Sequence, residues 1–183
     1  MSNTVYVNTT NFNELLDQRI TEVLGSEANR VLVGEMAYEN FRKHYGCAQS
    51  MMKAFMDVLE LHDDFWFRAL GGLQGGGGCG LTCGALNTGF ILINARIGRQ
   101  KIEDGFKGLV PMLESCHQLA HWFKLQYKST TCSEISGYDW LNTSEVIQQH
   151  LSEKGKERQE NCARLTSGTA FKVAEILYAS RQV

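Results

Sequence analysis

The sequence predicts an all-α, single-domain helical bundle with a glycine-rich loop at a cysteine site. The 183 residues include a single proline, Pro111, which favours long uninterrupted helices over many turns. Apolar residues recur at helical spacing through most of the chain, and there is neither a repeat of solenoid period nor a long linker. We expect one compact domain, made of an N-terminal helical segment, residues 1–36, and a cysteine-containing helical part, residues 37–183.

The first third of the chain predicts three helices. Residues 1–12, rich in Asn and Thr, are expected to be loosely structured. Residues 13–46 show the apolar periodicity of two amphipathic helices separated by a break at Gly25–Ser26. A third helix is expected over residues 47–62. Its apolar face consists of Cys47, Met51, Phe55, Val58 and Leu59.

Two further helices are expected in the middle of the chain. Residues 83–98 carry apolar residues at helical spacing. The run "GFILI" within them would also suit a β-strand, but the residues before it are helix-like, so a helix is favoured. Residues 101–129 predict a helix that starts or kinks near Pro111.

The C-terminal part predicts a short helix and a long one. The short helix lies within residues 137–155, with Asn142, Thr143 or Ser144 as its N-cap. The long helix runs from about residue 156 to 181. One of its faces consists of Cys162, Leu165, Thr169, Val173, Ile176 and Leu177.

Composition and charge exclude several classes of function. A formal net charge of −2 gives no basic surface for nucleic acid. The start of the sequence lacks the pattern of a signal peptide, and no apolar run approaches the roughly 18 residues of a membrane span. We expect a cytoplasmic protein without a membrane partner. Because cytoplasmic thiols are kept reduced, the six cysteines suit ligands or redox groups better than disulfides; the alternative is that they are small buried apolar residues.

The stretch "GGLQGGGGCGLTCGALNTG", residues 71–89, is the most unusual part of the sequence. A phosphate-binding loop would need a following Gly-Lys-Ser/Thr, which is absent. A flexible linker would not run directly into an amphipathic helix. Glycines allow the backbone to approach a bulky group closely. We therefore interpret the stretch as a close-approach loop that brings Cys83, and as an open question Cys79, to a buried inorganic centre.

Cys47 and Cys83 each stand immediately before an amphipathic helix. Unpaired backbone N–H groups and the positive end of the helix dipole stabilise a thiolate at such a position. The placement predicts a lowered pKa for both thiols, which suits a nucleophile or a ligand.

The remaining candidates carry weaker patterns. No CxxC pair is present, so neither a thioredoxin motif nor a zinc ribbon is indicated. His117 and His121 are four residues apart and could share a metal on one helix face, whereas Cys116 is expected to face the core. His44, close to Cys47 in sequence, is a candidate proton donor.

Four segments occur in the order found in the C_GCAxxG_C_C family of redox proteins and resemble its motifs. They are "AYENFRKHYGCAQSMMKAFMDVLEL", "ALGGLQGGGGCGLTCGALNTG", "TTCSEI" and "NCARLTSGTAFKVAEIL". The resemblance covers about residues 37–177. One position departs from the family pattern: CGAxxG has a glycine where this sequence has Thr88, and Gly89 follows.

This resemblance implies that Cys47, Cys83, Cys132 and Cys162 ligate an iron–sulfur cluster. The family is similar to the cluster-binding part of split-Soret cytochromes c, where such cysteines are associated with an iron–sulfur centre. Residues 37–183 would then form a redox domain that transfers electrons to or from a redox partner protein, with a homodimer as a further assembly to consider. Cys79, outside the signature, would be an additional ligand or a resolving thiol.

The cysteine spacing matches neither ferredoxin pattern, so [2Fe–2S] and [4Fe–4S] both remain open. Two other functions are compatible with the sequence. The first is a thiol–disulfide oxidoreductase, in which Cys83 or Cys47 is the nucleophile and Cys79 resolves it. The second is a Cys/His metal-binding sensor without catalytic activity.

Overall fold

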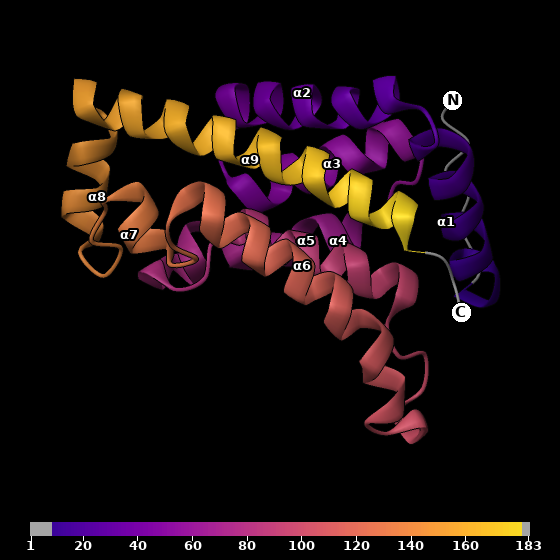
Figure 1. The fold of residues 1–183 in the computed structure, drawn as a ribbon. Coiled ribbons are helices and arrows are strands. Elements are labelled where there is room, and N and C mark those ends of the chain that lie inside the picture. Colours follow the sequence, from indigo (N-terminus) through magenta and orange to yellow (C-terminus); the bar gives the residue numbers. More distant parts are fainter. Residues whose placement is uncertain (1–8, 181–183) are drawn as a thin grey trace.

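The computed structural model describes residues 9–180, with side chains from residue 14 onward. Over this range the chain forms nine α-helices and no β-strand, which confirms the predicted all-α class (Figure 1). The helices are α1 (Thr9–Leu24), α2 (Glu27–His44), α3 (Cys47–Leu59), α4 (Asp64–Ala69), α5 (Gly84–Ile97), α6 (Val110–Tyr127), α7 (Cys132–Ser136), α8 (Thr143–His150) and α9 (Glu153–Ala179). Short turns connect them, including a π-type turn at Gly76–Gly80.

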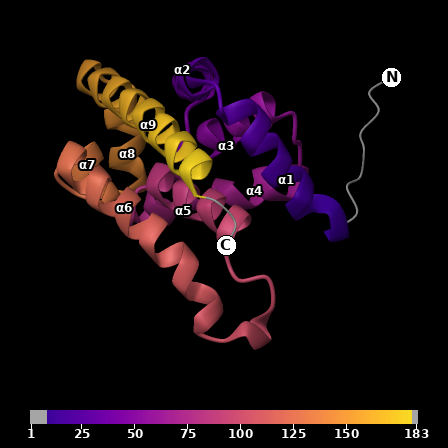
Figure 2. The same ribbon diagram turned by 45° about the vertical axis from the view of Figure 1, so that its right-hand side comes forward.

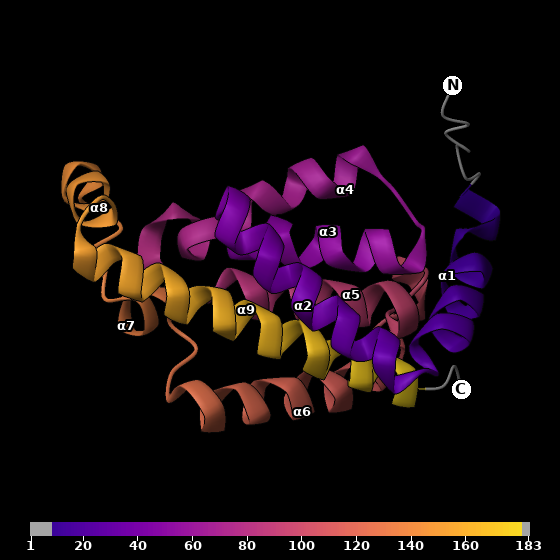
Figure 3. The same ribbon diagram turned by 90° about the horizontal axis from the view of Figure 1, so that it is seen from above.

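The longest helix, α9, organises the core. It lies beside α2 and also packs on α5 (Figures 1 and 3). Helix α3 fills the space below α2 and contacts α5. Burying a large apolar side chain stabilises the fold by about 1.5–3 kcal/mol. The fully buried residues among these four helices include Val33, Met51, Phe55, Leu86, Ile93, Val173 and Leu177.

The N-terminal helices follow the predicted break. Helix α1 ends at Leu24 and α2 begins at Glu27, so the interruption at Gly25–Ser26 is confirmed. The expectation of loose structure up to residue 12 is wrong for residues 9–12, which belong to α1; residues 1–8 lie outside the described range. Helix α2 contains residues on both sides of the boundary at 36/37, and the division into segments 1–36 and 37–183 stays a prediction.

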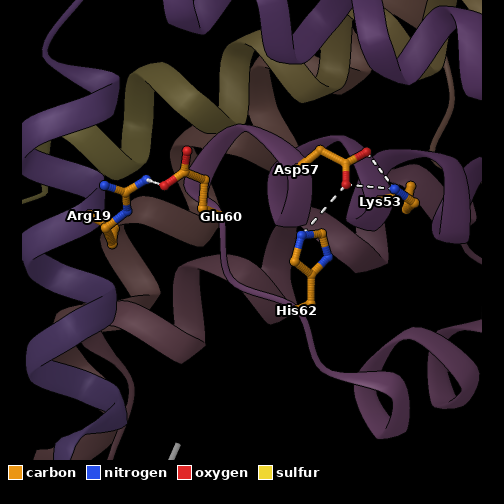
Figure 4. Close-up of polar contacts among 5 residues, drawn as sticks. All are labelled: Arg19, Lys53, Asp57, Glu60 and His62. Atoms are coloured by element: carbon orange, nitrogen blue, oxygen red, sulfur yellow. Dashed lines mark hydrogen bonds and ion pairs between the residues drawn. The ribbon is translucent and has the colours of Figure 1, made fainter. Parts of the chain in front are cut away.

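Polar contacts attach α1 to its neighbours. The Arg19 guanidinium donates to the Leu59 carbonyl and to the Glu60 carboxylate, where α3 ends in a left-handed residue (Figure 4). On α3 itself, Asp57 pairs with Lys53 and lies 3.9 Å from His62 Nε2 (Figure 4). These contacts hold the C-terminal end of α3 in place, whereas Cys47 lies at its N-terminal end.

The middle and C-terminal helices begin where their capping residues allow. "GFILI" lies inside α5, so the preference for a helix is confirmed. Pro111 stands in the first turn of α6, where its missing N–H costs nothing. Asn142 caps α8 by accepting from the Glu145 N–H, as one of the three predicted alternatives. Ser152 accepts from the Gly155 N–H, and so α9 begins at Glu153, earlier than expected.

The two ends of the molecule are formed by different elements. Helices α7 and α8 and the glycine-rich turn gather at one end, away from α1 (Figure 1). Near the other end, the connection between α5 and α6 projects from the body (Figure 2). None of the helices formed by residues 9–180 is long and apolar enough to cross a membrane.

Candidate functional site

A cavity of about 430 Å³ lies at the end of the molecule formed by α7 and α8. Four of the six cysteines line it: Cys47, Cys83, Cys132 and Cys162. Each comes from a different helix or helix start, namely α3, the residue before α5, α7 and α9. The thiols that the sequence places in four separate segments therefore share one cavity.

A short backbone pairing brings two of these cysteines together. Thr82 and Thr131 form an isolated antiparallel bridge. Beside it, the Cys83 N–H donates to the Thr130 carbonyl at 2.9 Å, and the Cys132 N–H donates to the Leu81 carbonyl at 2.6 Å. This pairing fixes the start of α5 against the start of α7.

The glycine-rich stretch approaches the site through Gly76. Glycines 75 to 78 all have positive φ, a left-handed turn that side chains other than glycine resist. A Cβ at Gly76 would lie 2.9 Å from the Cys132 Cβ and 2.4 Å from the Leu81 nitrogen. The stretch is thus a close-approach segment, as expected, and at Gly76 it approaches both the Leu81 backbone and the Cys132 side chain.

Cys47 and Cys83 form a coupled thiol pair. The Cys83 thiol donates a hydrogen bond to Cys47 and lowers the pKa of Cys47; burial acts against this effect, and the backbone N–H groups of Ala85 and Ala48 add to it. The same hydrogen bond, together with burial, raises the pKa of Cys83 well above its ordinary value. The sequence-based expectation of a lowered pKa is therefore confirmed for Cys47 and wrong for Cys83, because only one sulfur of a buried pair can carry the negative charge easily.

The other two cavity thiols favour their neutral form. Burial and the nearby Cys47 thiolate raise the pKa of Cys132 to about 11. The same two causes, with Cys132 as a further negative neighbour, raise the pKa of Cys162 to about 12. Without a positive partner, the four thiols do not readily ionise together. A cationic group such as iron would reverse this preference, since metal binding deprotonates a thiol outright.

Aromatic and polar side chains complete the cavity wall. The Trp140 Nε1–H donates to the Ser136 hydroxyl, which in turn donates to the Cys132 carbonyl at 2.8 Å. Tyr138 stands between them in sequence, and its hydroxyl is buried without a hydrogen-bond partner. The Tyr45 and His150 rings, which also line the cavity, meet edge to face, with centroids 4.9 Å apart.

Other predicted candidates lie outside the cavity. Cys79 is exposed on the π-type turn, so the glycine-rich stretch does not carry it to the cavity. Cys116 is half-buried against the core, as expected. His117 and His121 are both exposed on α6. His44, the candidate proton donor, is an exception and lines the cavity; its role stays a prediction.

Sequence reasoning missed the aromatic and amide side chains of the cavity: Tyr138, Trp140, His150 and Gln159. The segment "GYDWLN" follows Cys132 closely, and its two aromatic residues were a signal that could have been used. Gln159 and His150 carried no signal, because only the packing of α8 on α9 brings them to the thiols.

The four cavity thiols can be compared with the ligand arrangements of a single metal ion and of a cluster. Among the described residues, no three Cys, His or carboxylate side chains stand close enough to hold one ion. In a cluster, however, thiolates bind separate iron atoms and surround the group instead of converging on one point. Four thiols around the wall of one cavity correspond to that arrangement.

The fold and the cavity together define an all-α protein with a multi-cysteine site, to which three helix starts and the long helix α9 contribute. The chain belongs to the family described as "Putative redox-active protein (C_GCAxxG_C_C)", whose sequence profile matches residues 45–176, well over half of the 183 residues. The resemblance drawn from the cysteine motifs is thereby confirmed. Neither a curated protein nor a solved structure matches the chain.

Proposed function

We propose that the protein binds an iron–sulfur cluster through Cys47, Cys83, Cys132 and Cys162 and acts as an electron-transfer protein for a redox partner. The observation that carries the proposal is the cavity shared by the four signature thiols. The family assignment supports a redox role. The thiols come from four helix elements, so the folded chain itself would hold the ligands in place.

The backbone around Cys47 supports the same function. N–H groups of Ala48 and Ala85 point at its sulfur, and N–H donors to cluster sulfurs are one means by which a protein sets the reduction potential. The cavity wall is largely apolar and aromatic apart from a few polar groups. Such a wall limits access of water to a bound cluster, which also tunes its potential.

The test is anaerobic purification followed by determination of iron and acid-labile sulfide. The proposal expects both elements and charge-transfer absorbance in the wild type, and their loss in Cys132→Ser and Cys162→Ser. Cys79→Ser and Cys116→Ser are matched controls, because these two cysteines do not line the cavity. Zinc without sulfide would instead favour the metal sensor, and iron-free protein whose signature cysteines are dispensable would contradict the proposal.

A second candidate function is a thiol–disulfide reaction, which the Cys47–Cys83 pair favours. The Cys47 thiolate would attack a peroxide oxygen to form a sulfenic acid, with the leaving oxygen departing as water or an alcohol. The Cys83 thiol would then form a disulfide with Cys47 and release water. Because Cys79 is exposed and Cys83 is buried, this pair replaces the Cys79/Cys83 pair considered from the sequence.

Mass spectrometry of metal-free protein after mild peroxide treatment distinguishes these thiol pairs. A Cys47–Cys83 disulfide formed first would support the second function. Oxidation of exposed Cys79 alone, with Cys47 and Cys83 left reduced, would exclude it.

A further inference from the structure

A second cavity, of about 510 Å³, lies between α3 and α5, where α1 and α4 also border it. We call it the α3/α5 cavity. Its volume falls within the range of small-molecule sites, roughly 300–1,000 Å³. Most of its wall is apolar and includes Met52, Phe55, Met56, Leu61, Phe90 and Ile91. Two rings in this set, together with Trp66 of α4, offer flat faces to a flat ligand.

Three polar side chains interrupt this apolar wall and provide both hydrogen-bond acceptors and donors: Asp63, Asn94 and Arg99. The Asp63 carboxylate accepts the backbone N–H that it caps at the start of α4, and it has further lone pairs. Asn94 donates through Nδ2 to the Phe90 carbonyl at 3.4 Å, which leaves Oδ1 as an acceptor. The exposed Arg99 donates to the Gly105 carbonyl at 3.4 Å, and a guanidinium has five N–H groups to give.

The two opposite charges indicate the class of ligand. A fatty acid carboxylate would be attracted by Arg99 but repelled by Asp63, so a neutral molecule suits the cavity better. A quinone is neutral, flat and largely apolar, and its two carbonyl oxygens need donors. Two electrons and two protons turn both carbonyls into hydroxyls, which then need acceptors. A wall with both kinds of group can hold the oxidised and the reduced form.

The α3/α5 cavity also lies along the two helices that begin at the cysteine site. Helix α3 starts at Cys47, α5 starts directly after Cys83, and the two helices pack on each other (Figure 3). At 1.5 Å per residue, Met52 is about 8 Å along α3 from Cys47, and Phe90 is about 10 Å along α5 from Cys83. In a family of redox-active proteins, this position favours an electron-carrying ligand over other neutral aromatic molecules.

We propose that the α3/α5 cavity is a binding site for a quinone, with the ring in the apolar wall and the oxygens at Asp63, Asn94 and Arg99. The proposal goes beyond the function proposed above and does not require a bound cluster. It assigns a role to residues that take no part in the cysteine site.

The test is titration of the purified full-length protein with duroquinone, whose ring positions all carry methyl groups and therefore do not add a cysteine thiol. Calorimetry measures the affinity, and quenching of tryptophan fluorescence locates the ligand. We expect saturable quenching that is lost in Trp66→Phe and kept in Trp140→Phe, because Trp66 lines the α3/α5 cavity and Trp140 lines the cysteine cavity. Quenching that depends on Trp140 instead would place the ligand among the cysteines and overturn the inference.

Two substitutions in the wall test its polar and apolar parts. Arg99→Ala removes an exposed donor and should weaken duroquinone binding about tenfold, as expected for the loss of a charged hydrogen bond. Ile91→Phe narrows the cavity and should weaken binding about fivefold or more. The controls are Lys107→Ala, an exposed cation on the connection after α5, and Ile147→Phe on the exposed side of α8; both should bind like the wild type. Wild-type affinity in both wall variants would contradict the proposal.

Other occupants of the α3/α5 cavity give different results. Laurate that binds more tightly than duroquinone and displaces it would identify a fatty acid site and overturn the quinone assignment. Loss of duroquinone binding at concentrations where sedimentation shows self-association would identify a contact between two copies, with the same consequence. No readout depends on iron, so failure here leaves the cluster proposal standing, and iron-free protein that binds duroquinone in this cavity would overturn the cluster proposal alone.

Discussion

The sulfur of Cys47 lies directly against the Cα of Gly84. A Cβ added at residue 84 would stand 2.7 Å from Cys47 Sγ and 2.7 Å from the Leu73 carbonyl oxygen. The start of α5 can therefore approach the start of α3 only because residue 84 is glycine. The close contact also lets the Ala85 N–H point at the Cys47 sulfur.

The substitution Gly84→Ala should both destabilise the protein and displace the Cys47 thiol. Because one of the two contacts is with backbone, it cannot be relieved by turning a side chain, and we expect a loss of about 1–3 kcal/mol. Chemical unfolding measures the loss, and the rate of Cys47 alkylation measures the displacement. Gly72→Ala is the control, since no atom lies within 4 Å of its added Cβ; it should stay within about 0.5 kcal/mol of wild type. Equal stability and equal Cys47 reactivity in the two variants would contradict the prediction.

The stability of reduced, metal-free protein should fall as the pH rises above about 9. The pKa of Cys132 is raised to about 11 and that of Cys162 to about 12, whereas an unfolded thiol has a pKa near 8.5. Between these values the unfolded state loses protons that the folded state keeps. The stabilising contribution is therefore complete below the unfolded pKa and is lost as the pH rises toward the folded pKa.

The expected slope is about 1.4 kcal/mol per pH unit for each thiol whose pKa is raised. The raised pKa of Cys83 adds a third such thiol to Cys132 and Cys162. Urea unfolding at several pH values between about 8 and 10.5, with reductant and chelator present, measures it. Cys132→Ala should remove roughly one thiol's share of this slope. A variant with the full wild-type slope would show that Cys132 does not titrate as its burial requires.

The ion pair between Arg96 and Asp17 should be important for holding α1 on α5. The Arg96 side chain is 4% exposed, and its Nε and Nη2 both donate to Asp17 Oδ1, at 2.9 and 2.7 Å. Asp17→Ala would leave a buried cation without its partner, and we expect a loss of about 3 kcal/mol, since Asp17 itself is partly exposed. Glu153→Gln removes one member of a well-exposed pair with Lys156 and should leave the stability close to that of the wild type. Similar losses for the two variants in thermal unfolding would argue against a special role for Arg96.

We expect the Thr88 side chain to stabilise α5. It is fully buried, and its hydroxyl donates to the Gly84 carbonyl at 2.9 Å. Thr88→Gly loses buried atoms and helix propensity, so it should cost at least about 1 kcal/mol. Thr88→Ser, which keeps the hydroxyl, should fall between wild type and Thr88→Gly in chemical unfolding. A Thr88→Gly variant as stable as the wild type would contradict the prediction.

The close packing of α5 against its neighbours depends on Gly89, the residue after Thr88. A Cβ on Gly89 would stand 2.6 Å from Leu119 Cδ2 and 2.8 Å from Val173 Cγ2. Gly89 is therefore the residue that lets α5 approach α6 and α9 closely.

Local sequence signals predicted much of the fold. Helix starts could be predicted where a capping residue precedes apolar residues at helical spacing, as at Asn142. Capping depends only on residues within one helical turn, so the sequence shows it directly. The start of α9 was missed by a few residues, since the polar run after Ser152 gives no apolar period to follow. Helix α7 was missed because a helix of five residues is too short to show a period.

Only part of the candidate site could be predicted from such local sequence signals. The helix-start position of Cys47 predicted its lowered pKa, because the backbone donors to its sulfur include its immediate neighbour, Ala48. The raised pKa of Cys83 was not predictable, because it depends on the sulfur of a residue 36 positions earlier in the chain.

The sequence by itself determined the all-α class and the family. These follow from periodicity and motif order, which are local properties of the chain. Only the tertiary structure decided that Cys47, Cys83, Cys132 and Cys162 line one cavity while Cys79 does not, and that the Tyr138 hydroxyl is buried beside them without a partner. Such facts depend on the packing of α3, α5, α7 and α9 against one another, and contacts between distant segments leave no periodic trace in a single sequence.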